Sequence, residues 1–179
     1  INATNPDTNA WAQFESNRMS VEDFDAAFAA ESEARGHLIR GQAVLSLLSG
    51  DIRPRMVQAL KQIKQTHAVG CITNNVKSGQ GAGMARSESK AQAVAEVMAL
   101  FDTVIESSLV GIRKPNPEIY LMACRALSID PKQALFIDDL GINLKPAKAL
   151  GMTTIKVLNE AQALHDLSAA LDLVLPSQA

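Results

Sequence analysis

Three short apolar segments of this 179-residue chain each lead into residues that could take part in chemistry. The first segment ends in Thr73 and Asn74, the second is followed by Lys114, and the third ends in Asp138 and Asp139. Together they offer a hydroxyl with adjacent backbone N–H groups, a cation and a pair of carboxylates. This set suits phosphoryl transfer, in which a site must hold phosphate oxygens and neutralise the charge that spreads over them.

The paired carboxylates indicate a metal. Asp138 and Asp139 repel each other unless a cation lies beside them. Mg²⁺ takes one or two carboxylates and completes its octahedron with water and phosphate oxygens. We therefore predict Mg²⁺ as the cofactor, held by Asp138 and Asp139.

Each of these groups also has a purely structural interpretation. Thr73 could be a turn residue, Lys114 a solvated surface lysine, and the aspartates could complement the N-terminus of a helix. Their occurrence at three successive strand ends favours a site. In open α/β sheets, ligands bind outside the carboxyl ends of the strands, where the three groups are expected to converge.

The predicted elements alternate from residue 52 onward. Short apolar runs predict buried strands, and apolar residues at helical spacing predict helices between them. This alternation is typical of an α/β fold with a parallel sheet and crossover helices. The predicted strands are 68–73, 103–105, 134–137 and 153–157; the predicted helices are 53–65, 87–98, 116–127, 144–150 and 159–171.

Residues 11–50 predict helices only. Ser20 stands at capping-box spacing before a helix that contains Asp23 and Asp25. These two aspartates resemble a DxD pair, but no strand precedes them, so we interpret them as helix residues. The predicted organisation is a helical lobe over residues 1–50 and an α/β core over residues 51–179.

Composition excludes several classes of protein. Seventeen Lys and Arg against nineteen Asp and Glu give a net charge of −2, and aromatic residues make up 4%, so a nucleic-acid partner is not expected. No apolar run is long enough to cross a bilayer, so no membrane partner is expected either. Two distant cysteines exclude a disulfide scaffold and favour a cytoplasmic location. Response-regulator receivers use similar groups, but in the order acidic pair, Thr, Lys; here the acidic pair comes last.

At this point the motifs resemble the haloacid dehalogenase superfamily of aspartyl-phosphate hydrolases. The segments CITNN (71–75), RKPNPEIY (113–120) and FIDDLGINLKPAKALGMTTI (136–155) are similar to its second, third and fourth motifs. The last segment is particularly similar to the branch that contains the N-terminal phosphatase domain of soluble epoxide hydrolase. The resemblance implies a three-layer Rossmann-like core with a parallel sheet and a small all-helical cap.

The resemblance also implies roles for individual residues. Thr73 and the Asn74 backbone N–H would bind the phosphoryl group of the substrate, and Lys114 would stabilise both the nucleophile and the phosphoryl charge. Asp139 would be the more direct Mg²⁺ ligand, with Asp138 a second ligand or an outer-shell partner. Residues 1–50 would form most of a cap that selects the substrate.

One motif of the family has no counterpart here. This motif carries the nucleophilic Asp at the first strand of the family, which lies in the middle of the sheet. Neither Asp23 nor Asp25 can replace this nucleophile. Because the chain begins at Ile1 without Met, we expect this motif upstream and expect the chain alone to be inactive.

The resulting functional prediction is Mg²⁺-dependent hydrolysis of a small phosphate monoester through an aspartyl-phosphate. The alternatives are a haloacid dehalogenase, which needs no metal, and a catalytically inactive binding or regulatory module. The glycine-rich segment Gly79–Gly83 is interpreted as a loop near the mouth of the site. The particular substrate and the oligomeric state are left open.

Overall fold

The computed structural model describes residues 8–45, 47, 50–75 and 88–176. The chain divides into two compact units, each of which is described by itself. Unit 1 comprises residues 1–51, 73–96 and 106–113, and unit 2 comprises residues 52–72, 97–105 and 114–179. The predicted boundary near residue 50 between cap and core stays a prediction.

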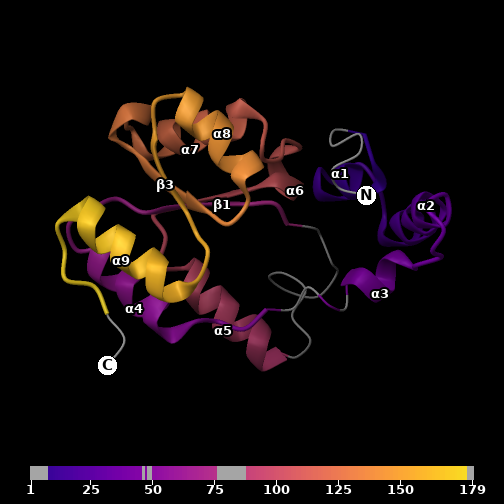
Figure 1. The fold of residues 1–179 in the computed structure, drawn as a ribbon, viewed down its shortest axis with the longest axis horizontal. Coiled ribbons are helices and arrows are strands. Elements are labelled where there is room, and N and C mark those ends of the chain that lie inside the picture. The colour runs from indigo at the N-terminus through magenta and orange to yellow at the C-terminus, as the bar shows by residue number, and fades with distance from the viewer. Residues whose placement is uncertain (1–7, 46, 48–49, 76–87, 177–179) are drawn as a thin grey trace. The chain divides into compact units, whose positions relative to one another are not determined.

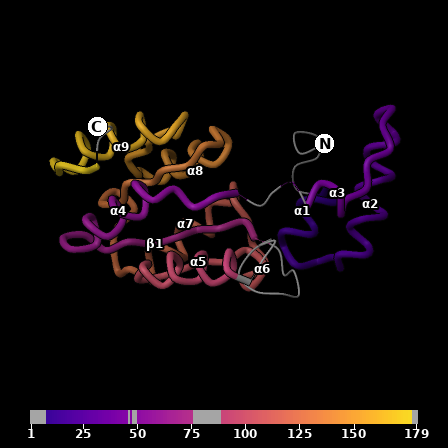
Figure 2. The backbone as a smooth tube through the Cα atoms, turned by 90° about the horizontal axis from the view of Figure 1, so that it is seen from below, coloured from indigo at the N-terminus to yellow at the C-terminus, as the bar shows by residue number. Residues whose placement is uncertain are grey.

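Three helices make up the N-terminal part of unit 1 (Figure 2). They are α1 (Ala10–Glu15), α2 (Val21–Glu33) and α3 (Gly41–Leu45). The Asn9 side chain caps α1, and the Ser20 hydroxyl accepts a hydrogen bond from the backbone N–H of Asp23, as the capping spacing predicts. The segment is therefore helical, as expected.

An aromatic cluster holds these helices together. Phe14 of α1 stacks on Phe24 of α2, with ring centroids 4.4 Å apart, and Trp11 meets Phe24 edge to face. Gly41 begins α3 against this cluster, and a Cβ atom there would lie 2.8 Å from the Phe24 ring. Only glycine allows such a close approach.

The two candidate DxD aspartates have structural partners. Asp23 belongs to the capped first turn of α2 and is exposed. Asp25 is buried, accepts a hydrogen bond from the backbone N–H of Gln42 at 3.0 Å and pairs with Arg40. It closes the turn into α3.

After α3, helices and strands alternate along the chain (Figure 1). The elements are α4 (Pro54–Ile63), β1 (Gly70–Thr73), α5 (Glu88–Met98), β2 (Thr103–Glu106), α6 (Ser107–Val110), α7 (Pro117–Leu127), the 3₁₀ helix η1 (Pro131–Gln133), β3 (Leu135–Asp138), α8 (Gly141–Ala149), β4 (Thr153–Lys156) and α9 (Glu160–Leu171). The mixed α/β class is confirmed. None of the helices in the described ranges is long and apolar enough to span a membrane.

The strands pair in two sets. β3 and β4 are parallel, with Leu135 opposite Thr153 and Asp138 opposite Lys156. β1 pairs with β2, and within the described residues the two pairs form separate two-stranded sheets. The sequence resemblance to the haloacid dehalogenase superfamily implies a further strand, the first of that family, in the middle of the sheet.

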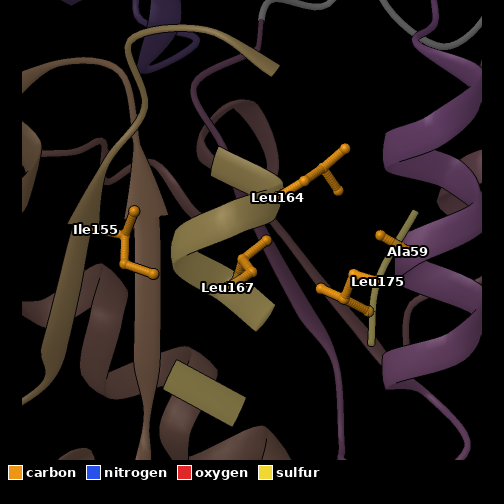
Figure 3. Close-up of a cluster of buried hydrophobic side chains, with 5 residues drawn as sticks. All are labelled: Ala59, Ile155, Leu164, Leu167 and Leu175. Atoms are coloured by element: carbon orange, nitrogen blue, oxygen red, sulfur yellow. The ribbon is translucent and has the colours of Figure 1, made fainter. Parts of the chain in front are cut away.

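The two faces of the β3–β4 sheet carry different partners. Successive residues of a strand point to opposite faces. Leu135 and Ile137 pack against a cluster formed by Ala59 of α4, Ile155 of β4, Leu164 and Leu167 of α9, and Leu175 (Figure 3). Phe136 points the other way and meets Tyr120 of α7 edge to face, with centroids 5.2 Å apart. The sheet thus lies between two helical layers, and Asp138 shares the face of Phe136.

Two short helices lie outside the elements that we predicted. The segment after β2, for which we predicted no helix or strand, contains α6, which is followed by Gly111 in the left-handed conformation. The helix η1 is held by a capping box between Asp130 and Gln133. In addition, α8 begins at Gly141, three residues before the predicted Leu144. Its N-cap residue is Leu140, whose side chain makes no capping hydrogen bond, so no capping residue marks this start in the sequence.

Candidate functional site

An ion pair between Lys114 and Asp138 lies at the centre of the site in unit 2. The Lys114 Nζ atom is 2.8 Å from Asp138 Oδ2, and the two side chains are only 13% and 5% exposed. Lys114 lies in the segment before α7, whereas Asp138 ends β3. The fold therefore brings together two predicted site residues that are 24 positions apart.

The Asp138 carboxylate is held by further hydrogen bonds. Its Oδ1 atom accepts from the backbone N–H of Leu140 at 2.8 Å. The Asn143 side-chain amide donates to both carboxylate oxygens, at 3.0 and 3.2 Å. With Lys114, these donors surround a buried carboxylate, which satisfies the requirement that a buried charge be paired and hydrogen-bonded.

Asn143 is a site residue that our sequence analysis missed. It is buried in the first turn of α8, five residues after Asp138. The one local signal in the sequence is an asparagine shortly after an acidic strand end; its burial, which requires a polar partner, is visible only in the structure. A residue in the first turn of that helix points back towards the strand end.

Two aromatic rings pack next to this ion pair. Lys114 Nζ lies 5.7 Å from the centre of the Phe136 ring, within the range of a cation–π interaction. Tyr120 packs against the same ring, and its hydroxyl donates to the backbone carbonyl of Asn143 at 2.7 Å. Burial, and secondarily the charge of Asp138, raise the pKa of Tyr120 above its usual value, so the hydroxyl stays protonated and donates.

The two aspartates differ in their surroundings. Asp139 is exposed, whereas the oxygens of Asp138 already accept hydrogen bonds from Lys114, Leu140 and Asn143. Across the described ranges, no cluster of three or more His, Cys, Asp and Glu could hold a metal. The carboxylates of Asp138 and Asp139 are a donor set that fits Mg²⁺ rather than zinc, because Mg²⁺ is held by one or two carboxylates and keeps several waters.

Thr73 and Asn74 belong to unit 1, whereas Lys114 and the two aspartates belong to unit 2. Thr73 is the last residue of β1, as predicted, and both Thr73 and Asn74 are partly buried. The convergence of the two groups at one site stays a prediction. The Gly79–Gly83 segment lies outside the described residues.

Asn75 anchors the end of β1 within unit 1. Its backbone N–H donates to the Ser107 hydroxyl at 3.1 Å, its side-chain carbonyl accepts from the Ser108 N–H at 3.2 Å, and its amide group donates to Glu106. The residues after Thr73 are thereby tied to the start of α6. Asn75 is a second residue to which our sequence analysis gave no role.

A further ion pair connects α1 to the segment before Lys114. Arg113 Nη2 lies 2.7 Å from Glu15 Oε2, and both side chains are largely buried. The Ser107 hydroxyl also donates to the backbone carbonyl of Glu15 at 2.7 Å. The helical N-terminal segment is thus fastened to residues 107–113 of the same unit.

The fold and these residues define an α/β protein with a lysine–aspartate ion pair at the end of a parallel strand. Residues 6–151 match the family model described as haloacid dehalogenase-like hydrolase. The chain belongs to this family.

Individual relatives agree with this assignment. The chain is 38% identical to mouse bifunctional epoxide hydrolase 2 over 122 residues, which cover 68% of the chain and 22% of the mouse protein. It is 28% identical to a phosphatase of Mycobacterium tuberculosis over 165 residues, covering 85% of the chain and 71% of that protein. The chain spans about a fifth of the length of the mouse relative.

A solved structure has the same fold. It is a haloacid dehalogenase family enzyme of Bacteroides thetaiotaomicron in complex with magnesium and inorganic phosphate. The TM-score is 0.58 at 21% identity, and the match covers 82% of this chain and 73% of that one.

Proposed function

We propose that this protein hydrolyses a small phosphate monoester in a Mg²⁺-dependent reaction through an aspartyl-phosphate. The observation that carries the proposal is the buried Lys114–Asp138 pair, held by Asn143, with the exposed Asp139 directly after it. An ammonium held at the end of β3 and the exposed carboxylate of the following residue would provide a charge for phosphate oxygens and a metal ligand.

Each residue has a distinct part in this proposal. Asp138 and the Phe136 ring hold the Lys114 ammonium, which neutralises negative charge on the transferring phosphoryl group. The Thr73 hydroxyl and the Asn74 backbone N–H donate hydrogen bonds to phosphoryl oxygens. Donors that are held in place before the substrate arrives would need no reorganisation during the reaction.

Asp139 is the proposed Mg²⁺ ligand. Asp138 is the outer partner, because its oxygens already accept hydrogen bonds from Lys114, Leu140 and Asn143. When bound, Mg²⁺ supplies positive charge for the phosphate oxygens. The magnesium and phosphate bound to the Bacteroides enzyme support this choice over a metal-independent dehalogenase.

The nucleophilic aspartate is proposed to come from a strand beside β3. Asp23 and Asp25 are not candidates, because both lie on α2 and Asp25 is bonded to Gln42 and Arg40. β3 pairs with β4 on one side only within the described residues. A parallel strand on its other side would bring a carboxylate to the same sheet edge as Lys114 and Asp139.

The proposal is tested by assaying the whole native protein with p-nitrophenyl phosphate, with Mg²⁺ and with excess EDTA. We expect hydrolysis with Mg²⁺ only, and we expect Asp139→Asn to lower kcat/KM by at least about 100-fold, because the metal ligand is lost. Asp172→Asn is the matched control: Asp172 is an exposed aspartate in a left-handed conformation that asparagine also adopts.

Three outcomes would contradict parts of the proposal. Full activity in excess EDTA would refute the Mg²⁺ assignment. Unchanged activity of Asp139→Asn would remove this residue from the site. Metal-independent release of chloride from 2-chloropropionate, without phosphate hydrolysis, would identify a dehalogenase instead.

A further inference from the structure

Tyr120 is a fully buried residue of α7 whose hydroxyl group has one specific partner. Its relative exposure is 0%, and the hydroxyl donates to the backbone carbonyl of Asn143, 23 residues away, at 2.7 Å. Burying a phenol hydroxyl is unfavourable unless it is hydrogen-bonded, and phenylalanine would fill nearly the same volume. The hydroxyl therefore calls for an explanation beyond packing.

The accepting carbonyl lies in a weakly supported part of α8. The N-cap residue Leu140 offers no side-chain capping bond. Pro146, inside the helix, has no N–H, so the carbonyl of Ile142 loses its ordinary helical donor. The first turn, which contains Asn143, is thus held by fewer helical hydrogen bonds than usual, and Tyr120 supplies a bond from outside.

This first turn carries the amide that clamps Asp138. The Asn143 side chain donates to both oxygens of the Asp138 carboxylate, and Lys114 pairs with Oδ2 of the same group. A displacement of the turn would move the amide, and with it the carboxylate that orients the ammonium. The chain of contacts from Tyr120 to Lys114 is continuous.

The Tyr120 ring has a separate role from its hydroxyl. The ring packs on Phe136, over which the Lys114 ammonium lies. Replacement of Tyr120 by Phe keeps this ring contact and removes only the hydroxyl. The two contributions can therefore be separated by one substitution.

We propose that Tyr120 is a positioning residue of the site: its hydroxyl holds the first turn of α8 so that Asn143 fixes Asp138 against Lys114. The inference rests on the proposed phosphatase function and extends it to a residue that does not touch the substrate. It assigns to the tyrosine of RKPNPEIY an effect on turnover that acts only through Asn143.

The test is a double-mutant cycle in the whole native protein, with p-nitrophenyl phosphate and Mg²⁺. We expect Asn143→Ala to lower kcat about 10- to 100-fold and Tyr120→Phe about 3- to 10-fold. The double variant should be no slower than Asn143→Ala alone, since the hydroxyl acts through that amide. Ile155→Val, on the opposite face of the sheet, controls for lost stability and should keep kcat.

A merely structural tyrosine would give a different result. Tyr120→Phe would then keep kcat within twofold of the unsubstituted protein, or would lower kcat by the same factor with and without Asn143; either result overturns the proposal. The cycle removes the Asn143 side chain while leaving its backbone carbonyl, so the Tyr120 bond can still form. Only the transmission to Asp138 is lost.

A failure of the proposed function is recognised separately. If the unsubstituted protein hydrolyses no phosphate monoester, the side-chain amide signals of Asn143 are followed by NMR instead. Tyr120→Phe should shift these signals and speed their exchange with water, whereas Ile155→Val should not. Unchanged Asn143 signals would overturn the positioning role.

Discussion

At the scale of single residues, the site combines two adjacent aspartates with opposite surroundings. Asp138 is buried and bonded to Lys114, Leu140 and Asn143, whereas Asp139 is exposed. Asp138 is the last residue of β3 and shares the face of Phe136, whereas Asp139 lies beyond the end of the strand. In the proposed site, Asp138 orients Lys114, and the exposed Asp139 binds the metal.

The burial of the Lys114–Asp138 pair predicts a large effect of Lys114→Ala on stability. Removing one partner of a buried pair leaves an uncompensated charge, so the free energy of unfolding should fall by about 3 kcal/mol. Lys90→Ala breaks the exposed Lys90–Asp51 pair, whose side chains are 45% and 86% exposed, and should cost less than about 1 kcal/mol. Urea denaturation of both variants measures the contrast.

Equal losses in the two variants would contradict this prediction. They would mean that Leu140 and Asn143 alone stabilise the Asp138 carboxylate in the folded protein. Burial would then have little influence on the strength of this pair.

At the scale of elements, the turn between α2 and α3 depends on one carboxylate. The backbone N–H of Gln42, aided by the Arg40 guanidinium, holds the pKa of Asp25 below its ordinary value near 3.8. A lowered pKa in the folded state means that the charged form stabilises the fold above the ordinary value. This contribution is lost as the pH falls through the lowered pKa.

We therefore expect Asp25→Asn to be less stable than the unsubstituted protein at neutral pH. The difference should shrink as the pH falls below about 4, where Asp25 of the unfolded chain becomes protonated, and should vanish once folded Asp25 is protonated at a lower pH. Urea unfolding from pH 3 to pH 7 measures it. Glu22→Gln, an exposed change on the same helix, should alter stability little across this range. A difference that stayed constant with pH would refute the role of the Asp25 charge.

Elements with strong local signals were predictable. Asn116 before Pro117 marks the start of α7, and Asn159 caps α9, because their side chains accept the first helical N–H groups. In contrast, α6 has four residues and no side-chain cap, and its start at Ser107 is set by Asn75 and by Glu15, 92 positions away. Contacts of that range leave no local pattern.

At the scale of the whole molecule, the sheet has an edge that the proposed function requires to be paired. The carbonyls of Ala134 and Asp138 accept hydrogen bonds from Thr153 and Val157 of the β4 segment. Since backbone groups alternate along a strand, those of Leu135 and Ile137 face the other edge of β3. A neighbouring strand that carries the nucleophile would pair with this edge.

Amide hydrogen exchange of the whole native protein tests this arrangement. We expect the Leu135 and Ile137 amides to be protected as strongly as those of Phe136 and Asp138, because a strand on each side of β3 shields all four. Fast exchange confined to Leu135 and Ile137 would show an unpaired edge. The proposed source of the nucleophile would then be wrong, whatever the activity.

The sequence by itself determined the family, the α/β class and the strand ends at Thr73 and Asp138. These features depend on local periodicity, capping and motif spacing, which the order of residues encodes directly. Only the tertiary structure decided that Lys114 pairs with Asp138 and that Asn143 completes the clamp. It also decided that Asp138 is buried while Asp139 is exposed, because burial depends on the helices packed over that face.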